Sequence, residues 1–243
     1  MKLLVYNIAY GTGHTGSPYD RLKNVHKLIR TPNTIITKIA NYTEKQAPDI
    51  IGLIEVDTGS SRTNRLNQVE EIARKISHNH ISAVKYNKKH IAYSLPIARF
   101  QSNAVLSKHE ISFSEFHFMP YGIKQLIIEV KIKKLSLFIV HLSIRKMVRK
   151  KQLTYLAKIA KGKNPLIIAG DFNTFSGQKE LDELKYELQL FSANSSSEPT
   201  FPSYKPKMEL DYILYSSDVK PLAFNIDRVD FSDHLPLIFD FEL

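Results

Sequence analysis

The sequence predicts an α/β fold of the mixed (α+β) type, in which strands outnumber helices. Short apolar runs bounded by Gly, Pro or polar clusters recur along the chain, and few segments between them have helical spacing. Strands and helices therefore do not alternate regularly, as they would in a parallel fold. The length suits one domain, residues 1–243. The chain has no Cys, which excludes disulfides, thiolate zinc sites and a Cys nucleophile.

The first half of the chain is expected to hold two helices among several strands. Apolar residues recur at helical spacing in Thr34–Lys45, and Pro48 ends that helix. Gln68–Ile76 suits a second helix, whereas Tyr19–Pro32 is polar and basic without a clear pattern. Strands are expected at Lys2–Asn7, Ile50–Val56, Ile81–Lys85, Asn103–Ser107 and Ile111–Phe118.

The second half begins with a predicted hairpin, Lys124–Ile132 with Lys134–Leu142. Lys150–Lys161 has the apolar spacing of an amphipathic helix, and Gln178–Leu190 is expected to be helical. Between them, Leu166–Ile168 is an apolar run bounded by Pro165 and Gly170, which is typical of a fully buried strand. The last strands are expected at Asp211–Tyr215, Lys220–Arg228 and His234–Phe241.

The net charge of +10 is unevenly distributed. Residues 124–163 hold twelve Lys/Arg and a single acid, Glu129, so the remainder of the chain is nearly neutral. A concentrated positive charge attracts polyanions, so the expected partner is nucleic acid, with an anionic membrane lipid as the alternative. A solvated helix face beside a Lys-guarded edge strand would give the same composition. No protein partner is inferred, and a monomer is expected.

No window is long and apolar enough for a membrane span, and the run at Leu3–Tyr6 is too short for a signal peptide. A cytoplasmic location is therefore expected, although export without a signal peptide is compatible with the sequence.

Polar residues stand at the ends of six predicted strands. Four strands end on such a residue and two begin with one. If the first four run toward one edge of the molecule and the last two run away from it, all six deliver polar side chains to the same edge. The gathered residues would be Asn7, Glu55, His141 and Asp171 at strand ends, Asn173 two positions further, and Asp211, Asp233 and His234 at strand starts.

This set offers four carboxylates, two amides and two imidazoles. Oxygen-rich ligation favours Mg²⁺ or Mn²⁺ over zinc, and such an ion would neutralise charge that develops at phosphorus. Asp211 with His234 is a candidate pair for a general base or a transition-state clamp. Each residue also has an ordinary alternative, because Asp171 and Asn173 are common strand-exit residues and a lone His is more often structural.

Eight short motifs stand in a fixed order along the chain: Tyr6–Ile8, Ile54–Asp57, Ser102–Ser107, His141–Ser143, Gly170–Asn173, Thr200–Ser203, Leu210–Ile213 and Ser232–His234. Each is weak alone, but the ordered set resembles the endonuclease/exonuclease/phosphatase superfamily from residue 6 to residue 240. The resemblance implies a four-layer, DNase I-like sandwich of two mixed β-sheets flanked by helices. It also implies hydrolysis of a phosphoester with a divalent metal at one rim of the sheets.

The resemblance also implies roles for the gathered residues. Glu55 would be the principal ligand of Mg²⁺ or Mn²⁺, with Asn7 and Asp233 nearby. Asp171 and Asn173 would orient the attacking water or a second ion, His141 would stabilise charge at phosphorus or assist the leaving group, and Asp211 would hold His234. Which of Asp171 and the Asp211–His234 pair takes the proton of the water is left open. The residues expected to contact substrate are Asn103, Arg149 and Thr200.

Two departures bear on the substrate. DNase I-like nucleases carry Arg where this chain has Asp57, and the 5-phosphatases carry Trp and Cys where it has Met208–Leu210. The motifs therefore most resemble small bacterial members of unassigned substrate.

Three functions are compatible with these motifs. A nuclease acting on DNA or RNA is favoured, because the basic cluster Arg145–Lys151 follows His141 closely. The alternative is a phospholipid or sphingomyelin-type phosphodiesterase, which requires exposed apolar residues at the rim, for which Phe201, Tyr204 and Met119–Tyr121 are the candidates. A non-catalytic polyanion-binding protein of the same fold is disfavoured, because every acid and His of the set is present.

Overall fold

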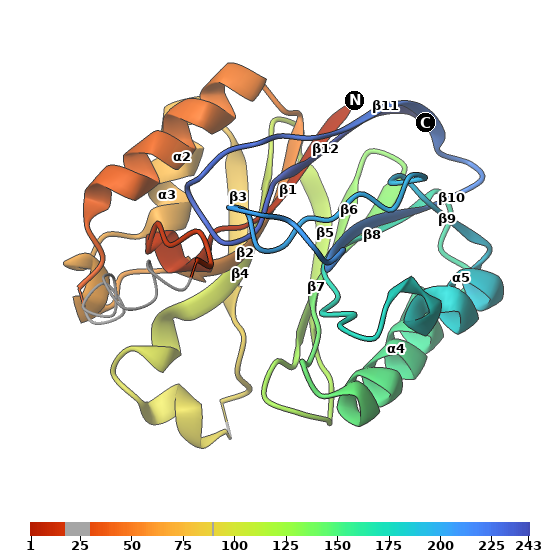
Figure 1. Ribbon diagram of the computed structural model, residues 1–243, viewed down its shortest axis with the longest axis horizontal. Coiled ribbons are helices and arrows are strands. Elements are labelled where there is room, and N and C mark those ends of the chain that lie inside the picture. The colour runs from red at the N-terminus through yellow and green to blue at the C-terminus, as the bar shows by residue number, and fades with distance from the viewer. Residues whose placement is uncertain (18–29, 89) are drawn as a thin grey trace.

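Two β-sheets packed face to face form the centre of the molecule (Figure 1). The computed structural model describes residues 1–17, 30–88 and 90–243. Most of the unassigned segment Tyr19–Pro32 therefore lies outside the described residues. No helix in the described part of the chain is long and apolar enough to cross a bilayer.

The first sheet has the strand order β11-β12-β1-β2-β4-β3. β1 and β2 are parallel, whereas every other pair in this sheet is antiparallel. Its strands are β1 (Lys2–Asn7), β2 (Ile50–Asp57), β3 (Asn79–Val84), β4 (Gln101–Ser107), β11 (Lys220–Ile226) and β12 (Leu237–Glu242).

The second sheet has the order β5-β6-β7-β8-β10-β9, and here β7 and β8 form the parallel pair. The predicted hairpin is β6 and β7, which are antiparallel neighbours. The strands are β5 (Ile111–Phe118), β6 (Leu126–Ile132), β7 (Leu135–His141), β8 (Leu166–Asp171), β9 (Leu190–Ser192) and β10 (Asp211–Ser216).

Helices cover the outer face of each sheet and complete four layers, which confirms the predicted sandwich (Figure 1). α2 (Asn33–Gln46) and α3 (Gln68–Ile76) pack on the first sheet, and α4 (Lys146–Ala160) and α5 (Asp182–Leu188) pack on the second. The 3-10 turns are η1 (Ala9–Gly11), η3 (Ser61–Thr63), η4 (Ile91–Ser94), η5 (Ala98–Phe100) and η6 (Gln178–Leu181).

The alternation of side chains along the central strands builds three apolar layers. In β1, Leu3 and Val5 face the core between the sheets, while Leu4 and Tyr6 face the helices. β7 divides its side chains in the same way between the two clusters that it separates. Because both faces are buried, such strands are continuous apolar runs in the sequence, which is why they were predicted.

The strand expected at His234–Phe241 begins at Leu237, so His234 precedes it instead of opening it. Two helices also differ from the sequence-based expectation. The helix expected at Lys150–Lys161 begins at Lys146, so it brings its first turn closer to the end of β7. The helix expected at Gln178–Leu190 is divided into η6 and α5 and ends at Leu188, because Leu190 enters the short strand β9 and pairs with Ser216.

Candidate active site

The polar residues at the strand ends lie at one edge of the sandwich. β1 and β2 run toward it in parallel, as do β7 and β8, and β10 starts there with Asp211 opposite Asp171. β12 is antiparallel to β1, so Asp233 and His234 precede it at the same edge. The two chain termini lie at the other edge (Figure 1). The directions that were assumed for the six strands are therefore those of the structure.

Asp171 is the centre of the group. Its Oδ2 accepts a hydrogen bond from Asn7 Nδ2 across the two sheets at 3.1 Å, and it lies 3.2 Å from His141 Nε2 and 3.9 Å from His234 Nε2. Burial alone would raise the pKa of Asp171, but the positive charge of His234 and the hydrogen bond from His141 lower it well below its usual range. Asp171 is thus an ionised carboxylate held between both halves of the molecule.

Glu55 enters the site through a β-bulge. The register between β2 and β4 shifts between Leu53 and Val56, and Glu55 has a φ of 57°. A non-glycine residue in this left-handed region carries strain on the order of 1–3 kcal/mol, which persists only where the surroundings enforce it. Asn103 of β4 holds the Glu55 backbone in this conformation, because its Oδ1 accepts the Glu55 backbone N–H at 3.2 Å.

Two lysines that were not predicted flank Glu55. Lys85 follows β3 and places Nζ 3.9 Å from Glu55 Oε1, and it also contacts the Tyr10 hydroxyl. Lys124 precedes β6 and contacts His141 Nε2. Burial would raise the pKa of Glu55, but Lys85, His141 and Lys124 lower it to about 2. Burial lowers the pKa of Lys85 to about 8 despite the neighbouring Glu55.

The predicted Asp211–His234 pair is present. Asp211 Oδ2 lies 2.8 Å from His234 Nδ1 and accepts the Thr200 hydroxyl at 2.6 Å. Burial lowers the pKa of His234, but the Asp211 and Asp171 carboxylates raise it to about 10. His234 is therefore an imidazolium whose Nε2 faces Asp171. Thr200 is fully buried and positions Asp211, so the structure gives it this partner in place of the expected substrate contact.

His141 is neutral, in contrast to the protonated His234. Burial and the Lys124 ammonium lower its pKa to about 4, against the opposing effects of Asp171 and Glu55. The ring is thus neutral at pH 7, and the two imidazoles of the site differ in charge because Asp211 accompanies only one of them.

Asn173 and Asp233 lie at the border of this group. β8 ends at Asp171, and Asn173 has a φ of 53°, so the strand alternation expected to align the two side chains does not extend to Asn173. Its backbone N–H instead donates to Asp171 Oδ1 at 3.0 Å, and its amide donates to the carbonyl of Leu142. Asp233 Oδ2 lies 3.7 Å from His14 Nδ1 and remains partly exposed.

The structure assigns Arg149 to the support of a loop, not to the surface that would meet a substrate. Its side chain is 1% exposed, and its guanidinium binds Glu180 through Nε and Nη2 and the carbonyl of Ser143 through Nη1. These contacts use the donors that were expected to reach substrate. Asn103 is likewise fully buried, but its Nδ2 has no hydrogen-bond partner among the described residues.

The geometry suits a hard cation. The ligand atoms of Asp171, Asp211 and His234 lie within 4.8 Å of one another. The protonated His234 ring has no lone pair for a metal, so the two carboxylates are the cation ligands that this group offers. Asp211 Oδ1, His141 Nδ1 and Asn103 Nδ2 are buried without a hydrogen-bond partner in the described part of the chain, as expected where a polar ligand completes the site. Glu55 and Asp233 lie outside that three-residue group. The Asn7 amide nitrogen donates to Asp171 and its Oδ1 accepts the Ala9 N–H, so one lone pair of Oδ1 remains for a cation.

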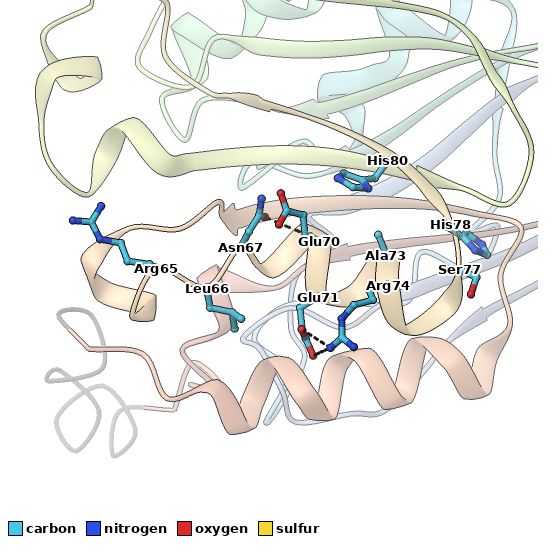
Figure 2. Close-up of a pocket in the computed structure, with 10 residues that line it drawn as sticks. All are labelled: Arg65, Leu66, Asn67, Glu70, Glu71, Ala73, Arg74, Ser77, His78 and His80. Carbon is cyan, nitrogen blue, oxygen red and sulfur yellow. Dashed lines mark hydrogen bonds and ion pairs between the residues drawn. The ribbon is translucent and has the colours of Figure 1, made fainter.

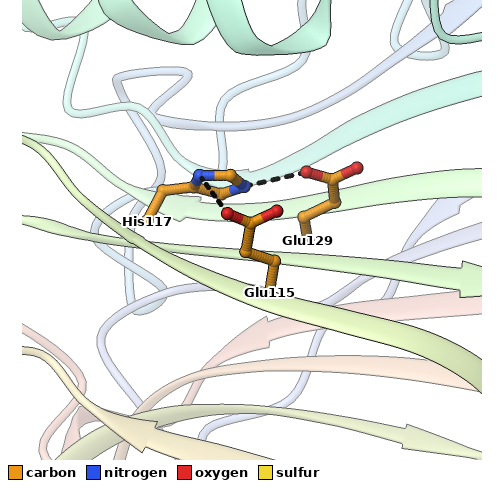
Figure 3. A group of neighbouring side chains, drawn as sticks. All are labelled: Glu115, His117 and Glu129. Carbon is orange, nitrogen blue, oxygen red and sulfur yellow. Dashed lines mark hydrogen bonds and ion pairs between the residues drawn. The ribbon is translucent and has the colours of Figure 1, made fainter.

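Two other features are separate from this site. Glu115, His117 and Glu129 on β5 and β6 also place ligand atoms close together (Figure 3), but Glu129 is already paired with His117 and Lys163. A surface hollow of about 580 Å³ runs along α3 and contains the Glu71–Arg74 ion pair (Figure 2). It contains none of the gathered residues.

The class that this fold and site define is a phosphoester hydrolase with a carboxylate and histidine centre at the rim of a two-sheet sandwich. The sequence profile of the Endonuclease/Exonuclease/phosphatase family matches residues 4–234, and the chain belongs to that family. Members of the family hydrolyse phosphoesters and generally use divalent metals. No curated protein matches the chain.

Solved structures share the fold at low sequence identity. A functionally unknown conserved protein from Enterococcus faecalis is 15% identical with a TM-score of 0.74, over 100% of this chain and 99% of that one. A mannosyl-6-phosphatase from Bacteroides thetaiotaomicron is 14% identical with a TM-score of 0.71, over the whole of both chains. The human Nocturnin catalytic domain, with a bound sulfate anion, is 17% identical with a TM-score of 0.68, over 100% of this chain and 93% of that one. These likenesses concern the fold.

Proposed function

We propose that the chain is a phosphodiesterase that depends on Mg²⁺ or Mn²⁺. The observation that carries the proposal is the meeting of Asp171 with Asn7, His141 and His234 beside the strained Glu55. Four acidic or imidazole side chains far apart in the chain converge there, and buried polar atoms of Asp211 and His141 have no partner within the described residues, so they are available to a bound ligand or water.

Each group has a proposed task. Glu55, Asn7 and Asp233 would hold the cation, which would neutralise charge on a phosphate oxygen. Asp171, fixed by the Asn173 N–H and Asn7, orients the attacking water. The His234 imidazolium, held by Asp211, and the Lys124 ammonium would stabilise negative charge at phosphorus. The neutral ring of His141 can accept or donate a proton at Nδ1, which lacks a hydrogen-bond partner in the described structure.

Nucleic acid is the first candidate substrate. Arg145, Lys146, Lys150 and Lys151 follow β7 at the site edge, and such a cluster can track successive phosphates. Activity on DNA or RNA should then fall steeply as salt rises.

A phospholipid is the second candidate, and a specific observation favours it. Of the apolar residues named for it from the sequence, Met119 is buried and Phe201 packs against the His234 ring, whereas Tyr121 and Tyr204 are exposed. Ile123 and Ile144, which were not named, are each 61% exposed at the same edge.

A substrate panel tests the reaction class. Single-stranded and duplex DNA, RNA, phospholipid in detergent micelles and bis-p-nitrophenyl phosphate are each assayed with Mg²⁺, with Mn²⁺ and with EDTA. Glu55→Ala should lower turnover by about a thousandfold or more, because an ion that contributes several kcal/mol is lost. Glu115→Ala, a carboxylate of the separate group in Figure 3, is the matched control and should keep activity. Turnover that survives EDTA or Glu55→Ala would refute the proposal.

A further inference from the structure

Three segments at the site edge expose an unusual number of apolar side chains. They are residues 90–100 between β3 and β4, 119–125 between β5 and β6, and 142–151 after β7, and together we call them the rim. Ile91 is 80% exposed and Met147 is 74% exposed, and what marks the rim is that several such side chains gather there, since single exposed apolar residues are common. The exposed large apolar residues of the rim are Ile91, Leu95, Tyr121, Ile123, Ile144 and Met147.

The three segments belong to one side of the molecule. β4 packs against β6 and β7 across the core, so the segment that leads into β4 lies opposite those attached to β6 and β7. In Figure 1 the three project at the lower edge, away from both termini. Lys85 begins the β3–β4 connection that contains the first segment, Lys124 lies within the second segment, and His141 immediately precedes the third. The rim therefore surrounds the approach to the candidate active site.

The charge of the rim is of one sign. Its three segments contain no Asp or Glu and seven Lys/Arg. Arg149 is buried against Glu180 and Lys124 contacts His141, so five cations remain exposed to a partner: Arg99, Arg145, Lys146, Lys150 and Lys151. Lys151 Nζ lies over the Tyr121 ring at 5.3 Å, so a cation and an aromatic side chain share one position at the surface. A polyanion or an anionic surface fits this charge.

The kind of apolar residue separates these two partners. Bases of single-stranded nucleic acid stack on aromatic rings, because each base presents a π-face. Five of the six exposed apolar residues of the rim are aliphatic or thioether side chains, which offer no such platform. They can instead enter the boundary between headgroups and acyl chains, while the basic side chains stay among anionic headgroups.

We propose that the rim docks on an anionic lipid bilayer and turns the candidate active site toward the headgroups. The proposal rests on the proposed function and develops its second candidate substrate. An apolar hollow of about 490 Å³ adjoins the first segment and is lined by Tyr86, Tyr93, Phe116 and Phe118. It offers apolar volume beside the rim, but aromatic rings also stack on bases, which is why the test below includes single-stranded RNA.

Vesicle sedimentation tests the docking separately from catalysis. The full-length Glu55→Ala protein is mixed with vesicles of phosphatidylcholine alone or of phosphatidylcholine with phosphatidylglycerol, at low and high salt. The rim variant carries Ile123→Ser, Ile144→Ser and Met147→Ser in that background. The control variant carries Phe113→Ser, Tyr186→Ser and Leu222→Ser, three exposed apolar residues outside the rim. Thermal unfolding shows that both remain folded.

The protein and the control variant should sediment with the anionic vesicles, and the rim variant should bind them at least about tenfold more weakly, because aliphatic surface no longer enters the bilayer. High salt should weaken binding to anionic vesicles without abolishing it. Absence of vesicle binding, or equal losses in both variants, would overturn the proposal. So would a rim variant that keeps vesicle binding and loses affinity for single-stranded RNA, because the rim would then serve nucleic acid. Any of these results would leave the reaction class intact if turnover of the soluble phosphodiester still depends on Glu55.

Discussion

Replacement of Lys85 by Met should strengthen metal binding while it weakens catalysis. The Lys85 ammonium lies 3.9 Å from Glu55 Oε1, and both side chains are largely buried. A cation that binds Glu55 must share this carboxylate with an existing positive charge. Removal of that charge therefore favours the metal, whereas the substrate phosphate loses a positive neighbour.

The magnitude follows from the distance. Two unit charges 3.9 Å apart interact by about 4 kcal/mol at an effective dielectric constant of 20. Glu55 retains some solvent contact, which screens its interaction with Lys85, and the Lys85 and Glu55 charges both stay near the bound ion. We therefore expect a quarter to a half of the Lys85–Glu55 energy, about 1–2 kcal/mol, to appear in the metal affinity. This corresponds to roughly 5–30-fold tighter binding of Mn²⁺ at pH 7.

Calorimetric titration of metal-free protein with Mn²⁺ measures this effect without substrate. Lys85→Arg keeps the charge and should keep the weaker affinity, and Lys75→Met removes an exposed lysine paired with Glu44 as the matched control. Because the pKa of Lys85 is about 8, the wild-type affinity should rise between pH 7 and 9 as the ammonium deprotonates, whereas that of Lys85→Met should change less. Unchanged or weaker Mn²⁺ binding by Lys85→Met at pH 7 would show that the ion does not bind beside Glu55.

Three further substitutions test other parts of the structure. Gly170→Ala should unfold the protein or destabilise it by several kcal/mol in urea denaturation. The added Cβ would lie 2.0 Å from the Val140 carbonyl oxygen, and Gly170 has a φ of 142°. A stable variant would contradict this packing. Arg149→Met should lower the free energy of unfolding by about 3 kcal/mol with little change in KM, because it leaves the largely buried Glu180 with the Ser176 N–H but without a cation; a large rise in KM alone would restore its expected contact with substrate. In metal-free protein, the pKa of His234 is higher in the folded than in the unfolded state, so the stability that its charge contributes is complete below pH 6.5 and is lost as the pH rises toward 10. His234→Gln should remove this part of the pH dependence of the free energy of unfolding. An unchanged pH profile would refute the prediction.

The layers of the fold could be predicted because each central strand is buried on both faces. Such strands leave uninterrupted apolar runs, as at Leu166–Ile168, and the few helices between them exclude a regular parallel fold. Strand β9 could not be predicted in the same way, since three residues carry too little alternation to separate them from the preceding helix.

The site could be predicted in part, because strand ends place polar residues at a common edge. The same rule, applied to cations, would have identified Lys85 and Lys124, which stand at the ends of predicted strands. The bulge at Glu55 could not be predicted, since it depends on the Asn103 side chain of a neighbouring strand 48 residues away. The burial of Arg149 could not be predicted from the sequence for the same reason, because its partner Glu180 lies on another element.

The basic segment shows why charge that is clustered along a chain need not be clustered in space. Residues 124–163 form two antiparallel strands and a helix, each of which spans the molecule from one edge to the other. The lysines of the β6–β7 turn and of the end of α4 consequently lie at the edge opposite the site, and Lys163 reaches from there to pair with Glu129 in the middle of β6. The positive field at the site edge therefore comes from fewer residues than the composition suggests. What distinguishes that edge is the absence of acids from the rim together with its exposed aliphatic side chains, a combination that a count of net charge does not reveal.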